Sequence, residues 1–266
     1  MIILNFHIPK TGGVFIRNTF INHGFTSRRV RAHGAPGRQR KDGCALVDIP
    51  SIIKKHKNKN LYFDIHPNFD PNQKSKMLSI KKCCEFLKKN VLNLEKDVYY
   101  ITSIRDPLDL NISLYNFTVS RNATESEVKG DFLKNYIPNR MSCKILFDEE
   151  HFAKPKPKYI KSRLWQFYNY HDESTIDQNE LNKELLLNFL RTSFDKIFIT
   201  SSLDSQIKTF FIDSLKINYD EHNGASKNQA QQKLLIKDDF NVEEVQKFKN
   251  NNLIDYFIFN HIKNDS

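Results

Sequence analysis

The pattern of apolar and polar positions opens with a short apolar run from Ile2 to Ile8, which is typical of a buried strand. Pro9 interrupts this run, and a pair of glycines follows it. The residues beyond them fit one face of a helix, namely Val14, Phe15, Ile16, Thr19, Phe20 and Ile21. We therefore predict a strand, a glycine-containing turn and an amphipathic helix, in that order.

A second unit of the same kind lies near residue 100. The segment Asp97–Ile104 is rich in β-branched and aromatic residues and predicts a strand. Arg105 and Asp106 follow it, and Pro107 suits the first position of a helix. The helical pattern then runs through Leu108, Ile112, Leu114, Tyr115 and Phe117.

Strand-like runs that alternate with helical ones predict an α/β protein with a central parallel sheet flanked by helices. The length of 266 residues and the 39% hydrophobic content suffice for one sizeable core, so we expect a single domain over residues 1–266. We expect loops or insertions at Arg28 to Gly43, Asn116 to Asp131 and Lys154 to Lys158.

The turn between the first strand and its helix has the chemistry of an anion site. Backbone N–H groups at a helix start point outward together with the positive end of the helix dipole. Gly12 and Gly13 would let the backbone approach an anion closely, and Lys10 adds a full positive charge. The spacing G-x-x-x-x-G-K-[ST] is absent, which argues against an ordinary P-loop NTPase.

Arg105 provides a second positive charge at the end of a predicted strand. Ser113 lies eight residues further on, about two helical turns into the next helix. Ligands of open parallel sheets bind beyond the carboxyl ends of the strands. Two such strand ends indicate two phosphate groups on one ligand.

These two motifs resemble those of sulfotransferases. Pro9-Lys10-Thr11-Gly12-Gly13 resembles their 5′-phosphosulfate loop, and the segment from Arg105-Asp106-Pro107 to Ser113 resembles their 3′-phosphate site. The pattern is similar to that of carbohydrate sulfotransferases of the heparan sulfate 2-O- and 6-O-type. Three further segments resemble a core strand, a loop over the nucleotide and the final helix, at 194–203, 223–228 and 252–257.

The resemblance implies a P-loop-NTPase-like fold and a PAPS-dependent enzyme, where PAPS is the co-substrate 3′-phosphoadenosine-5′-phosphosulfate. It implies sulfuryl transfer to an acceptor hydroxyl, with no metal. The donor-binding residues that it implies are Lys10, Thr11, Gly12, Gly13, Val14, Arg105, Ser113, Ser226 and Lys227. Lys10 would also stabilise charge on the leaving oxygen.

The acceptor hydroxyl needs a general base, and a histidine suits that role near neutral pH. The run Leu61–His66 resembles the strand that carries the base in this family, so we assign His66 as the base. His33, in a basic segment, is the second choice, whereas His7 fits a packing role in the first strand.

Two other functions remain open. Relatives usually have Ser or Thr where this chain has Val14 and Phe15, so a non-catalytic nucleotide- or polyanion-binding protein with a degenerate sulfotransferase fold is one alternative. A nucleotide or small-molecule kinase is the other, since it would use a similar strand–loop–helix cradle.

The net charge of +10 indicates an acidic partner. The clusters Arg28–Arg31 and Arg38–Lys41 could line a cleft for an anionic glycan acceptor, or could simply be solvated. Motifs typical of nucleic-acid binding are absent from the sequence, so no nucleic-acid partner is expected.

Location is predicted from cysteine usage and apolar segments. Four cysteines without metal-ligand spacing make a disulfide framework improbable and fit a reducing cytoplasm. No apolar stretch reaches the ~20 residues of a membrane span, and no cleavable leader is evident. We expect a cytoplasmic, or soluble microbial or viral, protein; a Golgi location would require an anchor removed from the amino terminus.

Overall fold

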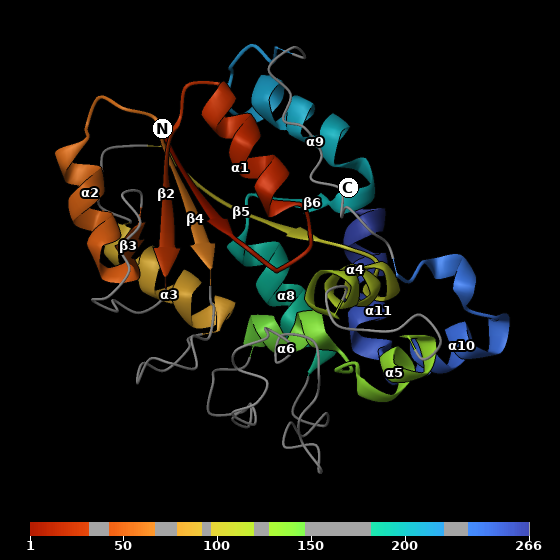
Figure 1. Ribbon diagram of the computed structural model, residues 1–266. Coiled ribbons are helices and arrows are strands. Elements are labelled where there is room, and N and C mark those ends of the chain that lie inside the picture. Colours follow the sequence, from red (N-terminus) through yellow and green to blue (C-terminus); the bar gives the residue numbers. More distant parts are fainter. Residues whose placement is uncertain are drawn as a thin grey trace.

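The computed structural model describes residues 1–31, 43–66, 79–91, 97–119, 128–146, 182–220 and 234–265 (Figure 1). Its strands are β1 (Ile2–Phe6), β2 (Thr26–Arg31), β3 (Gly43–Ala45), β4 (Leu61–His66), β5 (Val98–Ile104) and β6 (Lys196–Ile199). Its helices in the amino-terminal half are α1 (Gly13–Asn22), α2 (Ile49–Lys55), α3 (Ile80–Val91), α4 (Pro107–Val119) and α5 (Val128–Asn135).

The later helices are α6 (Arg140–Leu146), α8 (Lys183–Ser193), α9 (Leu203–Thr209), α10 (Val242–Asn251) and α11 (Leu253–Asn264). Short turns of tighter or wider helix are η1 (Leu46–Asp48), η6 (Thr200–Ser202), η7 (Phe210–Ser214) and η9 (Lys237–Asp239). No helix in the described ranges is long and apolar enough to cross a membrane.

The strands form one six-stranded sheet in the order β3-β2-β4-β1-β5-β6. Every pair of neighbours is parallel, which confirms the predicted α/β class with a central parallel sheet flanked by helices. The chain from β1 runs toward β2 and β3, and after β4 it crosses to β5 and β6. The carboxyl ends of β1 and β5 therefore lie beside each other where the direction of winding changes, which is where open α/β sheets bind ligands.

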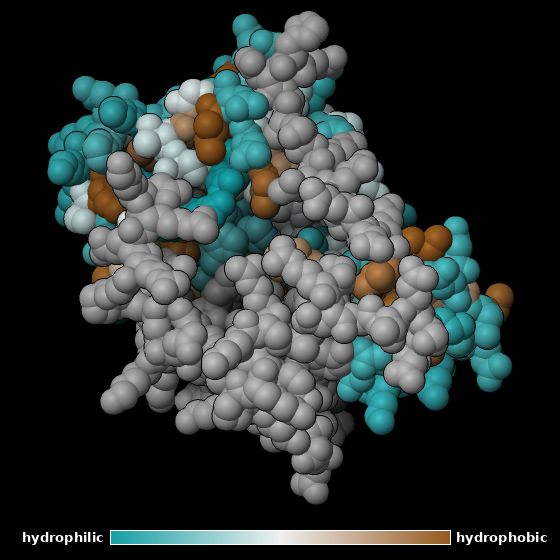
Figure 2. Space-filling model, viewed as in Figure 1, coloured by the Kyte–Doolittle hydropathy of each residue, from teal (hydrophilic) through white to brown (hydrophobic). Residues whose placement is uncertain are grey.

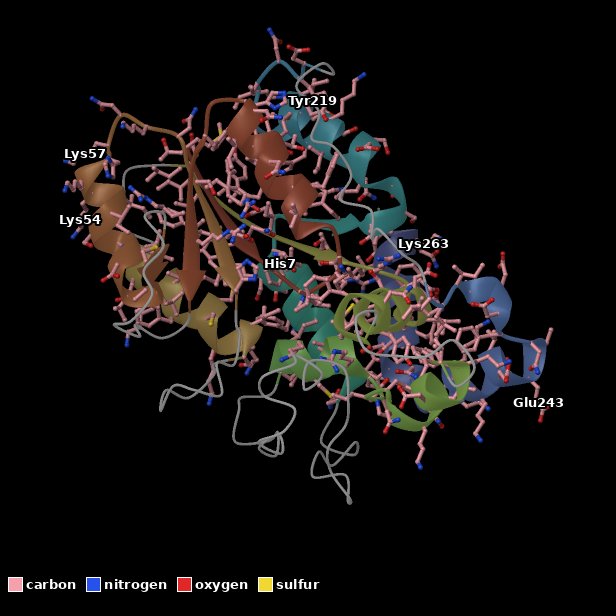
Figure 3. The ribbon with its side chains drawn as sticks, viewed as in Figure 1. His7, Lys54, Lys57, Tyr219, Glu243 and Lys263 are labelled. Carbon is pink, nitrogen blue, oxygen red and sulfur yellow. The ribbon has the colours of Figure 1, made fainter. Side chains whose placement is uncertain are left out.

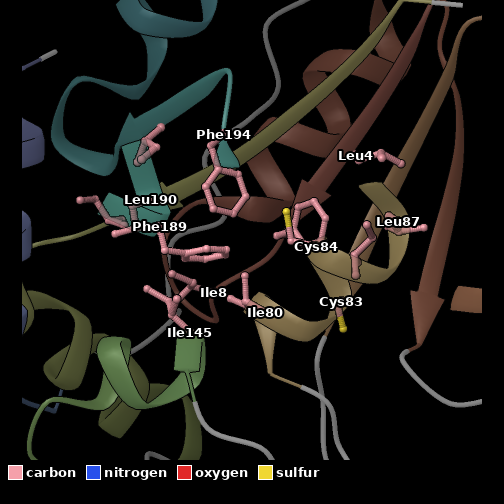
Figure 4. Packing of buried hydrophobic residues seen from close by; sticks show 14 of the residues in the cluster. Leu4, Ile8, Ile80, Cys83, Cys84, Leu87, Ile145, Phe189, Leu190 and Phe194 are labelled. Atoms are coloured by element: carbon pink, nitrogen blue, oxygen red, sulfur yellow. The ribbon is translucent and has the colours of Figure 1, made fainter. Parts of the chain in front are cut away.

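Each face of the sheet is covered by a different set of helices. Helices α1 and α9, with η7, pack on one face through apolar side chains such as Phe20, Ile207 and Phe211. Helices α2, α3, α6, α8 and α11 pack against the other face. Figure 4 shows part of that second cluster, to which Cys84 on α3, Phe194 after α8 and Leu4 of β1 all belong. Burial of both faces explains why the central strands have near-continuous apolar sequences.

A third apolar cluster lies beyond the end of β5 and joins α4, α5 and α10 around Phe132 and Phe248. The side chain of Asp255 on α11 accepts hydrogen bonds from the backbone N–H groups of Met141 and Ser142 and from the Ser142 hydroxyl. Because these donors begin α6, the Asp255 carboxylate caps that helix and fixes it to α11.

Two of the predicted loops are wrong in part. Residues 28–31 belong to β2, which is paired on both sides, with β3 and β4. The arginines of this segment obscure the apolar pattern of a strand, since Phe25 and Val30 are its buried apolar residues. The loop predicted at 116–131 overlaps the end of α4 and the start of α5, while 154–158 lies outside the described residues.

Candidate functional site

The turn between β1 and α1 is held in a tight, uncommon conformation. Lys10 has a φ of 70° and Gly12 a φ of 93°, so both occupy the left-handed region. Glycine adopts that region without strain, but for lysine it costs roughly 1 kcal/mol. A Cβ on Gly12 would also lie 2.6 Å from Leu203 Cδ2. This turn therefore requires glycine at position 12.

Thr11 fixes the turn from beneath. Its buried hydroxyl lies 2.8 Å from the Ile8 carbonyl oxygen and 2.7 Å from the hydroxyl of Ser103 on β5. Its own carbonyl oxygen accepts a hydrogen bond from the Thr200 hydroxyl at 3.1 Å. Because the Thr11 hydroxyl points inward, the group that this residue offers to a ligand is its backbone.

Arg105 connects the second motif to this turn. It follows β5, the neighbour of β1, and its Nη1 donates a hydrogen bond to the Lys10 carbonyl oxygen at 3.2 Å. Burial lowers the pKa of Lys10, and the nearby Arg105 charge lowers it further. The Lys10 ammonium lies 4.5 Å from the centre of the Phe117 ring, a cation–π distance. Two partly buried cations thus lie close together, and a bound anion would relieve their repulsion.

Asp106 begins the helix that follows Arg105. Its Oδ1 accepts hydrogen bonds from the backbone N–H groups of Leu108 and Asp109 at 3.0 and 3.1 Å, so Asp106 is the N-cap of α4. Pro107 occupies the first helical position, as predicted. Ser113 is half-buried on α4. The Arg-Asp-Pro sequence therefore has a structural role, which is to begin helix α4, whether or not it also binds a ligand.

Thr200 is a residue that the sequence did not reveal. It follows β6, and its hydroxyl lies within hydrogen-bond distance of the Thr11 and Ile104 carbonyl oxygens, at 3.1 and 2.9 Å. It therefore holds the ends of both motifs together from a third strand. A threonine after an apolar strand is a common sequence feature, so the sequence alone does not single out Thr200.

A second group of polar side chains lies at the ends of β1 and β4. Asn5 pairs in register with Asp64, and both are almost fully buried. His7 directly follows β1 and His66 ends β4, each two residues further along the chain, so all four share the face that α1 covers. His7 Nδ1 lies 3.2 Å from Asp64 Oδ1, and His66 Nε2 lies 2.8 Å from Asp64 Oδ2. The Asp64 carboxylate therefore bridges two imidazoles whose ring centres are 4.3 Å apart.

The charges of this group follow from its contacts. Burial alone would raise the pKa of Asp64, but hydrogen bonds from His66 and His7 outweigh it and hold that pKa well below its usual range. Burial and the neighbouring His66 lower the pKa of His7, and the opposing effect of Asp64 is smaller. At neutral pH the group therefore contains an ionised carboxylate and an uncharged His7.

The structure places His66 at the end of β4, in the predicted strand Leu61–His66, and β4 is paired with β1. The side chain of His66 is 23% exposed. His7 is 8% exposed and packs against Gly13, in keeping with the predicted packing role. Its link to Asp64 was missed. The signals were Asn5-x-His7 and Asp64-x-His66, two pairs at the spacing that puts side chains on one face of a strand. Figure 3 shows His7 near the middle of the molecule, where Figure 2 shows hydrophilic side chains at the centre of the same face.

Other predicted site residues divide into two sets. Phe15 packs in the apolar cluster beneath α1, whereas Val14 is partly exposed in the first turn of that helix, which has no side-chain cap. A first turn without a cap leaves backbone N–H groups available to a ligand. The remaining predicted residues, Ser226, Lys227, His33 and the basic run at 38–41, lie outside the described residues.

Comparison with protein-family models and with curated proteins finds no match to this chain.

Proposed function

We propose that this protein is a sulfotransferase that transfers a sulfuryl group from PAPS to an acceptor hydroxyl. The resemblance of its motifs to those of carbohydrate sulfotransferases favours a carbohydrate as the acceptor. The observation that carries the proposal is the hydrogen bond from Arg105 to the Lys10 carbonyl oxygen. It brings together, on adjacent strands, the two motifs that resemble the 5′- and 3′-phosphate sites of that family.

Donor binding would use two kinds of group. The free N–H groups at the start of α1 and the Lys10 ammonium would hold the 5′-phosphosulfate. The Arg105 guanidinium would hold the 3′-phosphate through a planar fork of donors, with Ser113 beside it on α4. Phe15 packs in the core, so backbone N–H groups would have to take the place of the hydroxyl that sulfotransferases usually have there.

The transfer step would be an in-line displacement at sulfur. The acceptor oxygen forms a bond to sulfur while the bond from sulfur to the 5′-phosphate oxygen breaks, and adenosine 3′,5′-bisphosphate leaves. The Lys10 ammonium would stabilise charge on the leaving oxygen. His66 would take the proton of the acceptor hydroxyl, and Asp64 would orient its imidazole through the 2.8 Å hydrogen bond.

Nucleotide binding tests the proposal directly. Calorimetric titration of the full chain with adenosine 3′,5′-bisphosphate, without magnesium, should give saturable binding tighter than that of ATP with magnesium. A preference for ATP with magnesium would favour the kinase alternative, and absence of binding to either would favour the degenerate protein. Transfer from labelled PAPS to a panel of glycan, lipid-linked sugar, small-molecule and tyrosine acceptors then identifies the acceptor class.

A further inference from the structure

The cluster of His7, Asp64 and His66 has features that a proton-accepting role for His66 alone does not require. Each of the three side chains offers one ligand-type atom, and these atoms lie within 4.8 Å of one another. Within the described ranges this is the one place where three or more such side chains gather. Their strands are hydrogen-bonded neighbours in the middle of the sheet, so the backbone beneath them is rigid.

The distances within the cluster match those between neighbouring ligands of a metal ion. Zinc-type ions bind imidazole nitrogen and carboxylate oxygen at about 2.0–2.2 Å. At the bond angles of tetrahedral or octahedral sites, adjacent ligand atoms are then roughly 2.8–3.6 Å apart. The two His–Asp64 contacts measure 2.8 and 3.2 Å. The two contacts reach different oxygens of the carboxylate, and the three ligand atoms lie within 4.8 Å of one another, so side-chain rotation would be needed to bring all three onto one ion. The ion would replace the two shared protons, which move to the other ring nitrogens or to solvent.

The surroundings also suit an ion. Asn5 Nδ2 donates to Asp64 Oδ1 at 3.3 Å, and such outer contacts orient a ligating carboxylate. The buried Asn5 Oδ1 has no hydrogen-bond partner. His66 is the most exposed member, with 23% of its side chain accessible, so solvent reaches the cluster on its side.

We propose that His7, Asp64 and His66 form a binding site for a divalent transition-metal ion of the zinc class. Two imidazoles and one carboxylate select zinc, cobalt, nickel or copper over magnesium and calcium, which prefer oxygen ligands. Arg17 acts on His7 from α1, and its positive charge opposes a cation, but it also favours the uncharged imidazole that a metal requires. The Asp64 carboxylate supplies the opposite charge.

This site stands independently of the proposed transfer reaction, because its binding needs neither donor nor acceptor. It has a consequence for that reaction if both are correct. An ion on His66 would bind Nε2, the nitrogen that faces Asp64, and the ring proton would then lie on Nδ1. Because Nδ1 is the nitrogen that would otherwise accept the proton of the acceptor hydroxyl, zinc would inhibit sulfuryl transfer rather than support it. Failure of one proposal leaves the other intact, since nucleotide binding and metal binding are measured separately.

Cobalt is the probe for the test. The chelator-treated full chain is titrated with Co²⁺ and followed by its visible absorption, and Zn²⁺ is then added as a competitor. We expect one ion per chain and displacement of cobalt by zinc. His7→Ala and Asp64→Asn should each weaken binding at least about 10-fold. His261→Ala is the matched control, because it removes an exposed imidazole on α11.

The variants also make the proposal refutable if a buried substitution unfolds the chain. His66→Ala alters the most exposed ligand, and circular dichroism checks that each variant is folded. Unchanged cobalt binding in folded His66→Ala would overturn the proposal. Failure of zinc at millimolar concentration to displace cobalt from the wild-type chain would also overturn it. Loss of binding in His66→Ala with retention in His261→Ala supports it.

Discussion

Arg105 donates a hydrogen bond from its guanidinium to the main-chain carbonyl oxygen of Lys10, across 3.2 Å. The acceptor residue has a φ of 70°, which is unusual for any residue other than glycine. The contact therefore holds a strained backbone in place and keeps two positive side chains at the same edge of the sheet. An anion bound between them would compensate their mutual repulsion.

Arg105→Ala should mainly weaken donor binding. A charge-assisted hydrogen bond contributes about 1.5–3 kcal/mol, so the affinity for adenosine 3′,5′-bisphosphate should fall roughly 10- to 100-fold. The affinity of Arg105→Lys should lie between those of the wild type and the alanine variant, because lysine keeps the positive charge but lacks the planar fork of donors of a guanidinium. Arg191→Ala is the control, since it removes an equal charge from an exposed pair with Asp265. Equal effects of the Arg105 and Arg191 substitutions on calorimetric affinity would exclude a specific phosphate contact.

Lys10→Ala and Lys10→Gly separate the ammonium from the backbone. Both remove the positive charge that would stabilise the leaving oxygen, so both should lower turnover at least about 100-fold. Glycine adopts the φ of 70° without strain, so Lys10→Gly should unfold at a higher temperature than Lys10→Ala, by roughly 1 kcal/mol in unfolding free energy. Transfer from labelled PAPS measures the effect on turnover, and thermal unfolding measures the effect on stability. Full turnover in the glycine variant would show that only the backbone at this position matters.

His66→Ala should reduce turnover while sparing the donor. Loss of a general base typically costs about 10²- to 10⁴-fold in rate. Since His66 lies on β4 rather than in the phosphate turn, affinity for adenosine 3′,5′-bisphosphate should stay within about 2-fold of wild type. The rates are measured with chelator present to keep metal ions away. An unchanged rate would remove His66 from the base role.

The sequence was sufficient to predict that Lys10 and Arg105 lie at the same edge of a parallel sheet. Each of the two residues follows an apolar strand, and the carboxyl ends of parallel strands lie at one edge of a sheet. The local apolar pattern and this general rule together predict the edge at which both residues lie. The end of β4 at His66 followed from the same reasoning. These features depend on short segments, where apolar periodicity and punctuation by Pro9 and Pro107 are informative.

The missed features depend on contacts between distant segments. Asp64 meets His7 because β4 lies beside β1, and no local pattern specifies which strands become neighbours. Thr200 joins two loops for the same reason. The sequence around Arg28 and Arg29 predicts a loop because it lacks the apolar alternation of a half-buried strand. Pairing with β3 and β4 on both edges nevertheless stabilises strand β2 there.

Gly13→Ala should disturb the histidine cluster through His7. A Cβ at Gly13 would lie 2.1 Å from His7 Cε1 and 2.2 Å from its Nδ1, and the ring is almost fully buried. We expect a loss of about 1–3 kcal/mol in unfolding free energy, as for other overpacked sites. Gly130→Ala is the control, because nothing lies within 4 Å of a Cβ there and alanine favours helix α5.

A double-mutant cycle identifies the cause of that loss. If the clash with His7 is responsible, the double variant Gly13→Ala/His7→Ala should be more stable than the sum of the two single effects predicts. Denaturant unfolding supplies the four free energies. Strict additivity would place the strain elsewhere in the turn.

Asp255→Ala should destabilise the protein without affecting ligand binding directly. The carboxylate accepts hydrogen bonds from Met141 N and Ser142 N at 2.9 and 2.8 Å, and all of these atoms are buried. Removing it leaves these donors unsatisfied, which should cost about 2–4 kcal/mol. Asp265→Ala is the matched control, because its exposed pairing with Arg191 contributes at most about 1 kcal/mol. Denaturant unfolding compares the two, and equal losses would show that α6 does not depend on the Asp255 cap.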